Sequence, residues 1–253
     1  MHEDYPIIKP TKSKKDPLIA ADSLMICLAS ELRYLATAHG ARKVSVNDMS
    51  IRKIHLVGQN GSAPLSLCGP FLGAPQAVLV MEKLIALGAR RLWMLGWCGS
   101  ISPALRVGGI VLPSCAYPEE GTSKHYPIAS IPPYTDKELC NTLEAILKRE
   151  KISFVRGPVW STDAPYRETI GKIRKYQKLG AIAVDMELSA LATVAHYRGV
   201  KFASLLVVSD ELFDYVWTPG FSDPRLASHT RAASEIIFEA ATSFSKCQEL
   251  GEA

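Results

Sequence analysis

This sequence of 253 residues has no paired-cysteine motif, no apolar leader and no strong excess of charge of one sign. Its six cysteines include no CxxC pair and several lie in apolar runs, which is typical of buried free thiols in a reducing compartment. The net charge of +4 is too small to indicate a nucleic-acid partner. Residues 1–17 contain no apolar core of the kind that a secretory signal needs. We therefore expect a cytoplasmic protein that binds no nucleic acid.

Uninterrupted hydrophobic runs of membrane-spanning length are also missing. Residues 56–81 contain no Asp, Glu, Lys or Arg and are long enough to cross a bilayer. Glycine and proline interrupt this stretch repeatedly, so we interpret it as two buried strands with a turn at residues 59–61, then a loop and the start of a helix. No membrane partner is expected.

The overall composition is that of a globular protein, with 47% hydrophobic and 21% charged residues. We expect a mobile polar arm at residues 1–17 and a single domain over residues 18–253. Strands are predicted at 24–28, 51–57, 65–68, 91–95, 107–112, 152–155, 182–184 and 201–208, and helices at 30–39, 75–87, 136–150, 167–179, 187–198 and 224–243. This alternation of strands and helices indicates an α/β fold.

Candidate chemistry lies where three predicted strands end, because ligands of α/β sheets bind beyond the carboxyl ends of the strands. Residues 96–99 (GWCG) predict a glycine-rich turn whose N–H groups face an anion or a sugar, or simply a tight turn. Asp185 and Glu187 precede a helix, where acids either stabilise the helix start or bind a diol, a role that favours the longer Glu187. Asp210 follows a buried strand and is either a general acid or a helix cap.

Six segments occur in the order and spacing found in one enzyme family. They are residues 67–75 (LCGPFLGAP), 95–100 (LGWCGS), 106–111 (RVGGIV), 120–126 (EGTSKHY), 184–187 (VDME) and 208–210 (VSD). Over about residues 22–243 the chain thus resembles the nucleoside phosphorylases of the purine and uridine phosphorylase type. The resemblance implies a three-layer αβα sandwich around a mixed, partly closed central sheet. It also implies a homo-oligomer, either a dimer, a trimer of dimers or a hexamer.

The resemblance further implies cleavage of the N-glycosidic bond of a nucleoside by phosphate, which gives the free base and a pentose 1-phosphate. Glu187 then binds the ribose 2′- and 3′-hydroxyls, Met186 packs on the sugar, and Asp210 protonates N7 of a purine. Inorganic phosphate is the expected co-substrate, and no cofactor or metal is expected.

The expected phosphate site departs from the family pattern. The family loop Gly-Asp-Pro-x-Arg reads ASELR here, so only Arg33 matches, and a second family arginine is replaced by Met94. The glycine-rich segment contributes Gly96 and, in place of a phosphate-binding serine or threonine, Trp97. Because phosphate is a dianion that favours forked arginine donors, these losses weaken the case for phosphorolysis. Arg33 is either a phosphate ligand or an exposed helix residue.

Three functions therefore remain open. Residues 120–126 resemble phosphorylases more than nucleoside hydrolases of the same fold. Glu31, however, aligns with the glutamate that positions water in such hydrolases, so a nucleosidase is the second hypothesis. The third is a nucleoside-binding protein in which Trp97 fills the phosphate site. The presence of both Glu187 and Asp210 favours an enzyme, because a binding protein has little use for an acid aimed at the leaving base.

The base is expected to lie between Gly99, Asp210 and the loop at residues 161–167. Tyr166 either stacks on the base or packs in the core. Arg167 either donates to a pyrimidine carbonyl or belongs to a solvated helix. Asp210 favours purines and Arg167 favours pyrimidines; we prefer purines because Asp210 occupies a family motif position.

Overall fold

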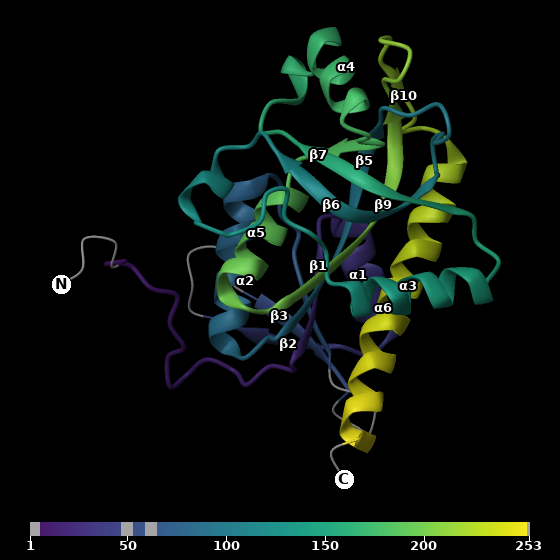
Figure 1. The fold of residues 1–253 in the computed structure, drawn as a ribbon. Helices are drawn as coiled ribbons and strands as arrows, with labels where there is room; N and C mark the ends of the chain where they lie inside the picture. The colour runs from purple at the N-terminus through teal and green to yellow at the C-terminus, as the bar shows by residue number, and fades with distance from the viewer. Residues whose placement is uncertain (1–5, 47–52, 59–64, 252–253) are drawn as a thin grey trace.

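A mixed sheet forms the centre of this computed structural model, which describes residues 6–46, 53–58 and 65–251 (Figure 1). Its strands are β1 (Asp22–Ile26), β2 (Arg42–Ser45), β3 (Lys53–Val57), β4 (Leu65–Cys68), β5 (Arg91–Ser100), β6 (Ile110–Pro118), β7 (Phe154–Ser161), β8 (Ala183–Asp185), β9 (Lys201–Glu211) and β10 (Thr218–Pro219). They run in the order β10-β9-β6-β7-β8-β5-β1-β4-β3-β2.

The sheet closes on itself at one end. Strand β9 pairs in parallel with β5 and antiparallel with β6, and the pairs β6–β7, β7–β8 and β8–β5 complete a ring. From β5 the sheet continues as an open extension through β1 and β4 to β3 and β2. The mixed, partly closed sheet predicted for this α/β fold is thereby confirmed.

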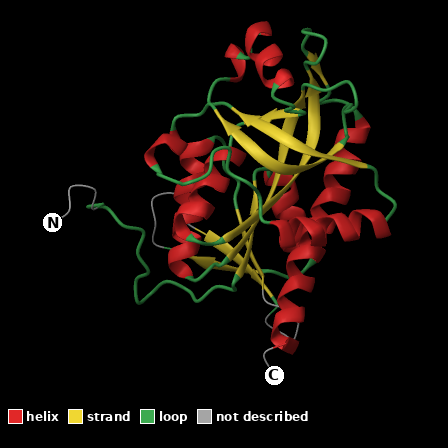
Figure 2. Cartoon of the chain, viewed as in Figure 1, coloured by secondary structure: helices red, strands yellow, loops and turns green. Residues whose placement is uncertain are grey.

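Helices cover both faces of the sheet (Figure 2). They are α1 (Ala29–Ala38), α2 (Ala74–Leu87), α3 (Lys137–Arg149), α4 (Ile170–Lys178), α5 (Leu188–Arg198) and α6 (Pro224–Gly251), with short 3₁₀ turns η1 (Thr122–His125) and η2 (Pro165–Arg167). In β1, Met25 packs in the core that contains α2 and α5, whereas Leu24 and Ile26 pack in the core of α1, α3 and α6. Side chains of a strand alternate between its faces, so the two helix layers lie on opposite sides, and the three-layer sandwich is confirmed.

Local sequence signals explain where several helices begin and end. Asp136 caps α3, since its Oδ1 accepts hydrogen bonds of 3.0 Å from the N–H groups of Glu138 and Leu139. Gly199 ends α5 in the left-handed conformation, with φ of 65°. The helices predicted at residues 136–150 and 187–198 are thus confirmed.

The turn predicted at residues 96–99 is wrong, because β5 continues through them to Ser100. Gly96 pairs with Leu206 of β9, and Gly99 pairs with both Asp210 of β9 and Val184 of β8. Hydrogen-bonding partners on both edges extend the strand despite its two glycines. The short strands β2 and β10 were not predicted, and the turn predicted at residues 59–61 lies outside the described residues.

The segment before β1 lies as an extended trace along the outside of the molecule (Figure 1). The Lys83 ammonium on α2 donates to Asp16 Oδ2 and to the Thr11 carbonyl, at 2.8 Å each. The Lys83 and Asp16 side chains are only 4% and 1% exposed, so the pair is buried. This contact joins residues 11–16 to α2, while the mobility of residues 1–17 stays a prediction.

Candidate active site

The parallel strands β1, β5 and β9 bring three predicted segments to one edge of the sheet. The start of α1 follows β1, residues 96–100 form the end of β5, and Ser209 and Asp210 lie near the end of β9. Strand β8 ends at Asp185 beside this edge because Val184 pairs with Gly99. The fold therefore brings residues from four distant parts of the sequence together.

The two acids before α5 have different surroundings. Asp185 is buried and its Oδ2 accepts hydrogen bonds from the N–H groups of Leu188 at 2.7 Å and Glu187 at 3.2 Å. Its Oδ1 accepts a 2.5 Å hydrogen bond from the Ser161 hydroxyl. Glu187 makes no capping hydrogen bond, although it occupies the N-cap position. Helix capping is therefore the role of Asp185, and the carboxyl group of Glu187 is available for another one.

Glu187 is buried, with 6% of its surface exposed, and its Oε1 accepts a 2.5 Å hydrogen bond from the N–H of Gly73. Burial, followed by the charge of Asp185, raises the pKa of Glu187 to about 8. Cys27 lies close by at the end of β1; burial and then the Glu187 charge raise the pKa of its thiol. An acid that interacts with few protein donors at a strand end is suited to accept hydrogen bonds from a polar ligand.

Asp210 is half-buried, and each of its oxygens accepts one hydrogen bond. The Ser209 hydroxyl donates to Oδ1 at 2.7 Å, and the indole N–H of Trp217 donates to Oδ2 at 2.9 Å. The neighbouring position on β5 is Gly99, where a Cβ would lie 2.6 Å from the end of the Leu212 side chain and 3.3 Å from Asp210 Oδ2. Gly99 therefore leaves the space in which the Asp210 carboxyl group lies.

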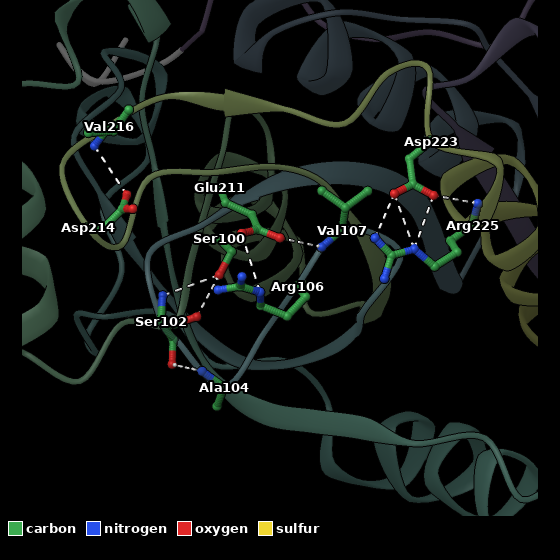
Figure 3. Close-up of polar contacts among 10 residues, drawn as sticks. All are labelled: Ser100, Ser102, Ala104, Arg106, Val107, Glu211, Asp214, Val216, Asp223 and Arg225. Atoms are coloured by element: carbon green, nitrogen blue, oxygen red, sulfur yellow. Dashed lines mark hydrogen bonds and ion pairs between the residues drawn. The ribbon is translucent and has the colours of Figure 1, made fainter.

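Glu211 points elsewhere, although it follows Asp210 directly. Its Oε1 accepts a 2.9 Å hydrogen bond from the N–H of Val107, and its Oε2 lies 3.4 Å from Nε of Arg106 (Figure 3). These contacts join the end of β9 to the loop before β6. Of the two adjacent acids, Asp210 faces Gly99 and Glu211 holds this loop.

The predicted phosphate side has little free positive charge. Arg33 is exposed on α1 and makes no hydrogen bond or ion pair within the described part of the chain. Met94 is fully buried. The Trp97 indole N–H donates to Thr230 Oγ1 of α6 at 2.9 Å, so it is already engaged. Gly96 lies in β5, where a Cβ would lie 3.2 Å from the Leu206 side chain and 3.3 Å from Cys27 Sγ.

Glu31 is held by an arginine that sequence reasoning did not find. Arg231 on α6 donates from Nε and from one terminal nitrogen to the two oxygens of Glu31, at 2.7 and 3.2 Å. The guanidinium group also lies over the ring of Tyr34, 3.5 Å from its centroid. Glu31 and Arg231 are 200 positions apart, so no local pattern signals this pair. Each oxygen of Glu31 thus accepts one charge-assisted hydrogen bond from Arg231, and a role of Glu31 in positioning water stays a prediction.

The predicted base loop places a different residue inward. Tyr166 and Arg167 are both exposed, whereas the next residue, Glu168, is half-buried. Burial, followed by the charge of Asp210, raises the pKa of Glu168 to about 7. The sequence offers one signal for Glu168, because this acid directly follows the two predicted base-binding residues, Tyr166 and Arg167. The roles of Tyr166 and Arg167 at the base stay predictions.

Residues 120–126 are joined to α5 through a buried carboxylate. Glu120 accepts hydrogen bonds from the hydroxyls of Ser123 and Ser189 and from the N–H of Ser123. Ser123 also lies 3.1 Å from the Thr193 hydroxyl. This network holds the loop against the helix that begins after Glu187.

A hollow of ≈ 530 Å³ is found away from these residues, between α1, the end of α3 and α6. His39, Glu235 and Phe238 belong to its lining, and no candidate site residue does. Within the described ranges, no three His, Cys, Asp or Glu side chains are grouped so as to hold a metal ion. The helices among those residues are also too short or too polar to cross a bilayer.

The chain belongs to the phosphorylase superfamily, whose sequence profile matches residues 24–241. It is 26% identical over 148 residues to a guanosine phosphorylase of Halorubrum lacusprofundi, and the aligned residues cover 58% of this chain and 61% of the relative. It is 27% identical over 151 residues to a DeoD-type purine nucleoside phosphorylase of Bacillus cytotoxicus, and the aligned residues cover 59% of this chain and 64% of the relative. The chain thus spans about three fifths of the length of these curated relatives.

Solved structures show the same fold. Purine nucleoside phosphorylase of Toxoplasma gondii, in complex with immucillin-H, superposes with a TM-score of 0.79 at 18% identity, covering 90% of this chain and 93% of that one. Uridine phosphorylase of Vibrio fischeri superposes with a TM-score of 0.76 at 21% identity, covering 88% and 92%. The resemblance found in the sequence is confirmed at the level of family and fold.

Proposed function

We propose that this protein is a nucleoside phosphorylase, which transfers the pentose of a nucleoside from its base to inorganic phosphate. One observation carries the proposal. Asp185 caps α5, and this leaves Glu187 buried at the strand ends with its Oε1 bound to the N–H of Gly73. Membership of the phosphorylase superfamily supports this reaction class.

Glu187 is proposed to bind the sugar. Its carboxylate can accept hydrogen bonds from two neighbouring hydroxyl groups, and those donors favour the ionised form that burial disfavours. The 2′- and 3′-hydroxyls of ribose form such a pair. Met186 is half-buried beside Glu187 and is proposed to pack on the sugar ring.

Asp210 is proposed as the general acid toward the base. In the reaction a phosphate oxygen forms a bond to C1′ while the bond from C1′ to N9 breaks, and the electron pair of that bond stays on the base. The proton of the Asp210 carboxyl group passes to N7, so the base leaves as a neutral molecule. A purine is the proposed base, which agrees with the purine and guanosine phosphorylases among the relatives.

Phosphate is proposed to bind near Arg33, the arginine of the α1 segment that has no partner among the described residues. Hydrolysis by water is the second candidate, and two observations favour it. Met94 is buried and apolar, and the N–H of Trp97 is engaged by Thr230. The pair between Glu31 and Arg231 gives no support to Glu31 as the residue that positions water.

A single assay separates these reactions. The purified protein is incubated with inosine, guanosine, adenosine or uridine, with and without inorganic phosphate, and the free base and pentose 1-phosphate are measured. We expect release of a purine base that requires phosphate and yields one pentose 1-phosphate per base. Base release at the same rate without phosphate would establish hydrolysis. No base release from any nucleoside would refute the proposed enzyme.

A further inference from the structure

Residues 212–221 form a hairpin that returns over the general acid proposed above. After leaving β9 the chain turns and comes back as β10, where Thr218 pairs with Glu211 and Pro219 pairs with Asp210. The residue before β10 is Trp217, whose indole N–H donates to Asp210 Oδ2 at 2.9 Å. Trp217 remains 59% exposed, so burial in a core does not account for its placement.

The hairpin has a defined shape. Tyr215 in the turn has φ of 67°, a conformation that is unusual for a residue other than glycine. The Asp214 side chain accepts a 3.2 Å hydrogen bond from the N–H of Val216 across this turn (Figure 3). On the returning side, the N–H of Gly220 donates to the Ser209 carbonyl at 2.9 Å. A Cβ at Gly220 would lie 2.5 Å from Val107, so glycine allows the close approach.

Trp217 belongs to a row of three aromatic side chains whose neighbouring rings pack against one another. The rings of Trp217 and Phe221 have centroids 6.4 Å apart, and those of Phe221 and Trp97 are 6.2 Å apart. Trp97 is itself anchored by its hydrogen bond to Thr230 of α6. This aromatic row, defined as Trp97, Phe221 and Trp217, connects the body of the protein with the Asp210 carboxyl group.

We propose that Trp217 is a positioning residue for Asp210, and that Trp97 supports it through Phe221. The inference rests on the proposed role of Asp210 as general acid. It also assigns a function to Trp97 that needs no contact with phosphate.

The physical reason is the charge that develops on Asp210. When its proton passes to the base, the carboxyl group becomes a carboxylate. A hydrogen bond to an ionised acceptor is stronger than one to a neutral acceptor, so the indole N–H stabilises the group more after transfer than before. Tryptophan can only donate, so it holds Oδ2 in one orientation. The hydrogen bond from Trp217 therefore stabilises the transition state more than it stabilises the bound substrate.

The test compares Trp217→Phe with the wild type on two ribosides. Phenylalanine keeps an aromatic ring but has no N–H, and the exposed position tolerates the change. On a purine nucleoside we expect kcat to fall about tenfold or more with KM unchanged, the usual scale for losing a hydrogen bond to a charged group. On 4-nitrophenyl riboside, whose leaving group needs no proton, we expect unchanged kcat. Trp97→Phe should produce a smaller loss with the same dependence on the leaving group.

Two further variants make the test decisive. Trp93→Phe removes an equivalent bond, because the Trp93 indole donates to Asp22 Oδ1 at 3.0 Å in the buried core; it should lower stability without any dependence on the leaving group. In the Asp210→Asn background, Trp217→Phe should add no further loss on purine nucleosides, because both changes remove one function.

The outcomes separate this inference from the proposed function. If Asp210→Asn affects both ribosides equally, the general-acid role fails, and the role of Trp217 fails with it. If Asp210→Asn affects the nucleoside selectively but Trp217→Phe affects neither or both ribosides, the inference alone is overturned. An additive loss in the double variant would also overturn it.

Discussion

Replacement of Glu187 by glutamine should make the protein less active and more stable. Burial and the Asp185 charge raise the pKa of Glu187 to about 8, against an ordinary value of 4.5. Below pH 4.5 Glu187 is protonated in both the folded and the unfolded chain, so its raised pKa costs no stability. Between pH 4.5 and 8 only the unfolded chain releases it, so the free energy of unfolding falls as the pH rises.

The size of the gain follows from this pKa difference. Each unit of pKa corresponds to about 1.4 kcal/mol, so the rise from 4.5 to about 8 corresponds to a gain on the order of a few kcal/mol at pH 8. Glutamine can still accept the hydrogen bond from the N–H of Gly73, and it carries no proton that the unfolded chain would release. We expect Glu187→Gln to exceed the wild type in stability, with a difference that grows from pH 5 to pH 8.

Activity should change in the opposite direction. An amide accepts hydrogen bonds only through its oxygen, so it cannot bind two ribose hydroxyls as a carboxylate does. We expect turnover of a riboside to fall by roughly a hundredfold, as for the loss of other preorganised polar contacts. Steady-state kinetics and urea unfolding at several pH values measure both effects.

Glu82→Gln is the matched control. Glu82 is also buried on a helix, but Arg198 binds it through Nε and a terminal nitrogen at 2.9 and 2.8 Å. Its loss should lower stability and leave turnover unchanged. The reasoning is refuted if Glu187→Gln keeps wild-type turnover, or if it is less stable than the wild type at every pH.

Three further predictions address the site. Nucleoside affinity should increase as the pH rises toward 8, because the ribose hydroxyls favour ionised Glu187, and binding below that pH should release a proton. Calorimetry in buffers of different ionisation enthalpy measures the number of protons released. Nucleoside binding that does not depend on pH would contradict the prediction. Asp185→Asn should shift this pH dependence to lower pH, because the Asp185 charge raises the pKa of Glu187, while an amide oxygen can still accept the hydrogen bond from the Leu188 N–H that caps the helix. Arg33→Ala should weaken phosphate binding roughly tenfold to a hundredfold and leave nucleoside binding intact, whereas damage from Glu31→Gln alone, in an assay without phosphate, would favour hydrolysis.

The sequence alone was sufficient for those features that depend on periodicity and on short motifs. The apolar stripe and capping residue of α3 lie within fifteen neighbouring positions, and the motif segments are each under ten residues long. Such patterns can be recognised in the sequence, because the interactions that produce them are local. The fold class, the family and the acids at the strand ends therefore follow from the order of the residues along the chain.

Tertiary structure decided which atoms are free to act. Local signals made residues 96–99 a turn, but strands on both sides hold them in β5. Side-chain length favours Glu187 over Asp185 as the diol ligand, but only the position of the Leu188 N–H shows that Asp185 is the helix cap. The partners of Glu31, Trp97 and Asp210 come from α6 and from the hairpin. Two of these contacts join residues more than a hundred positions apart, and the packing of helices on the closed sheet, rather than any local pattern, brings such residues together.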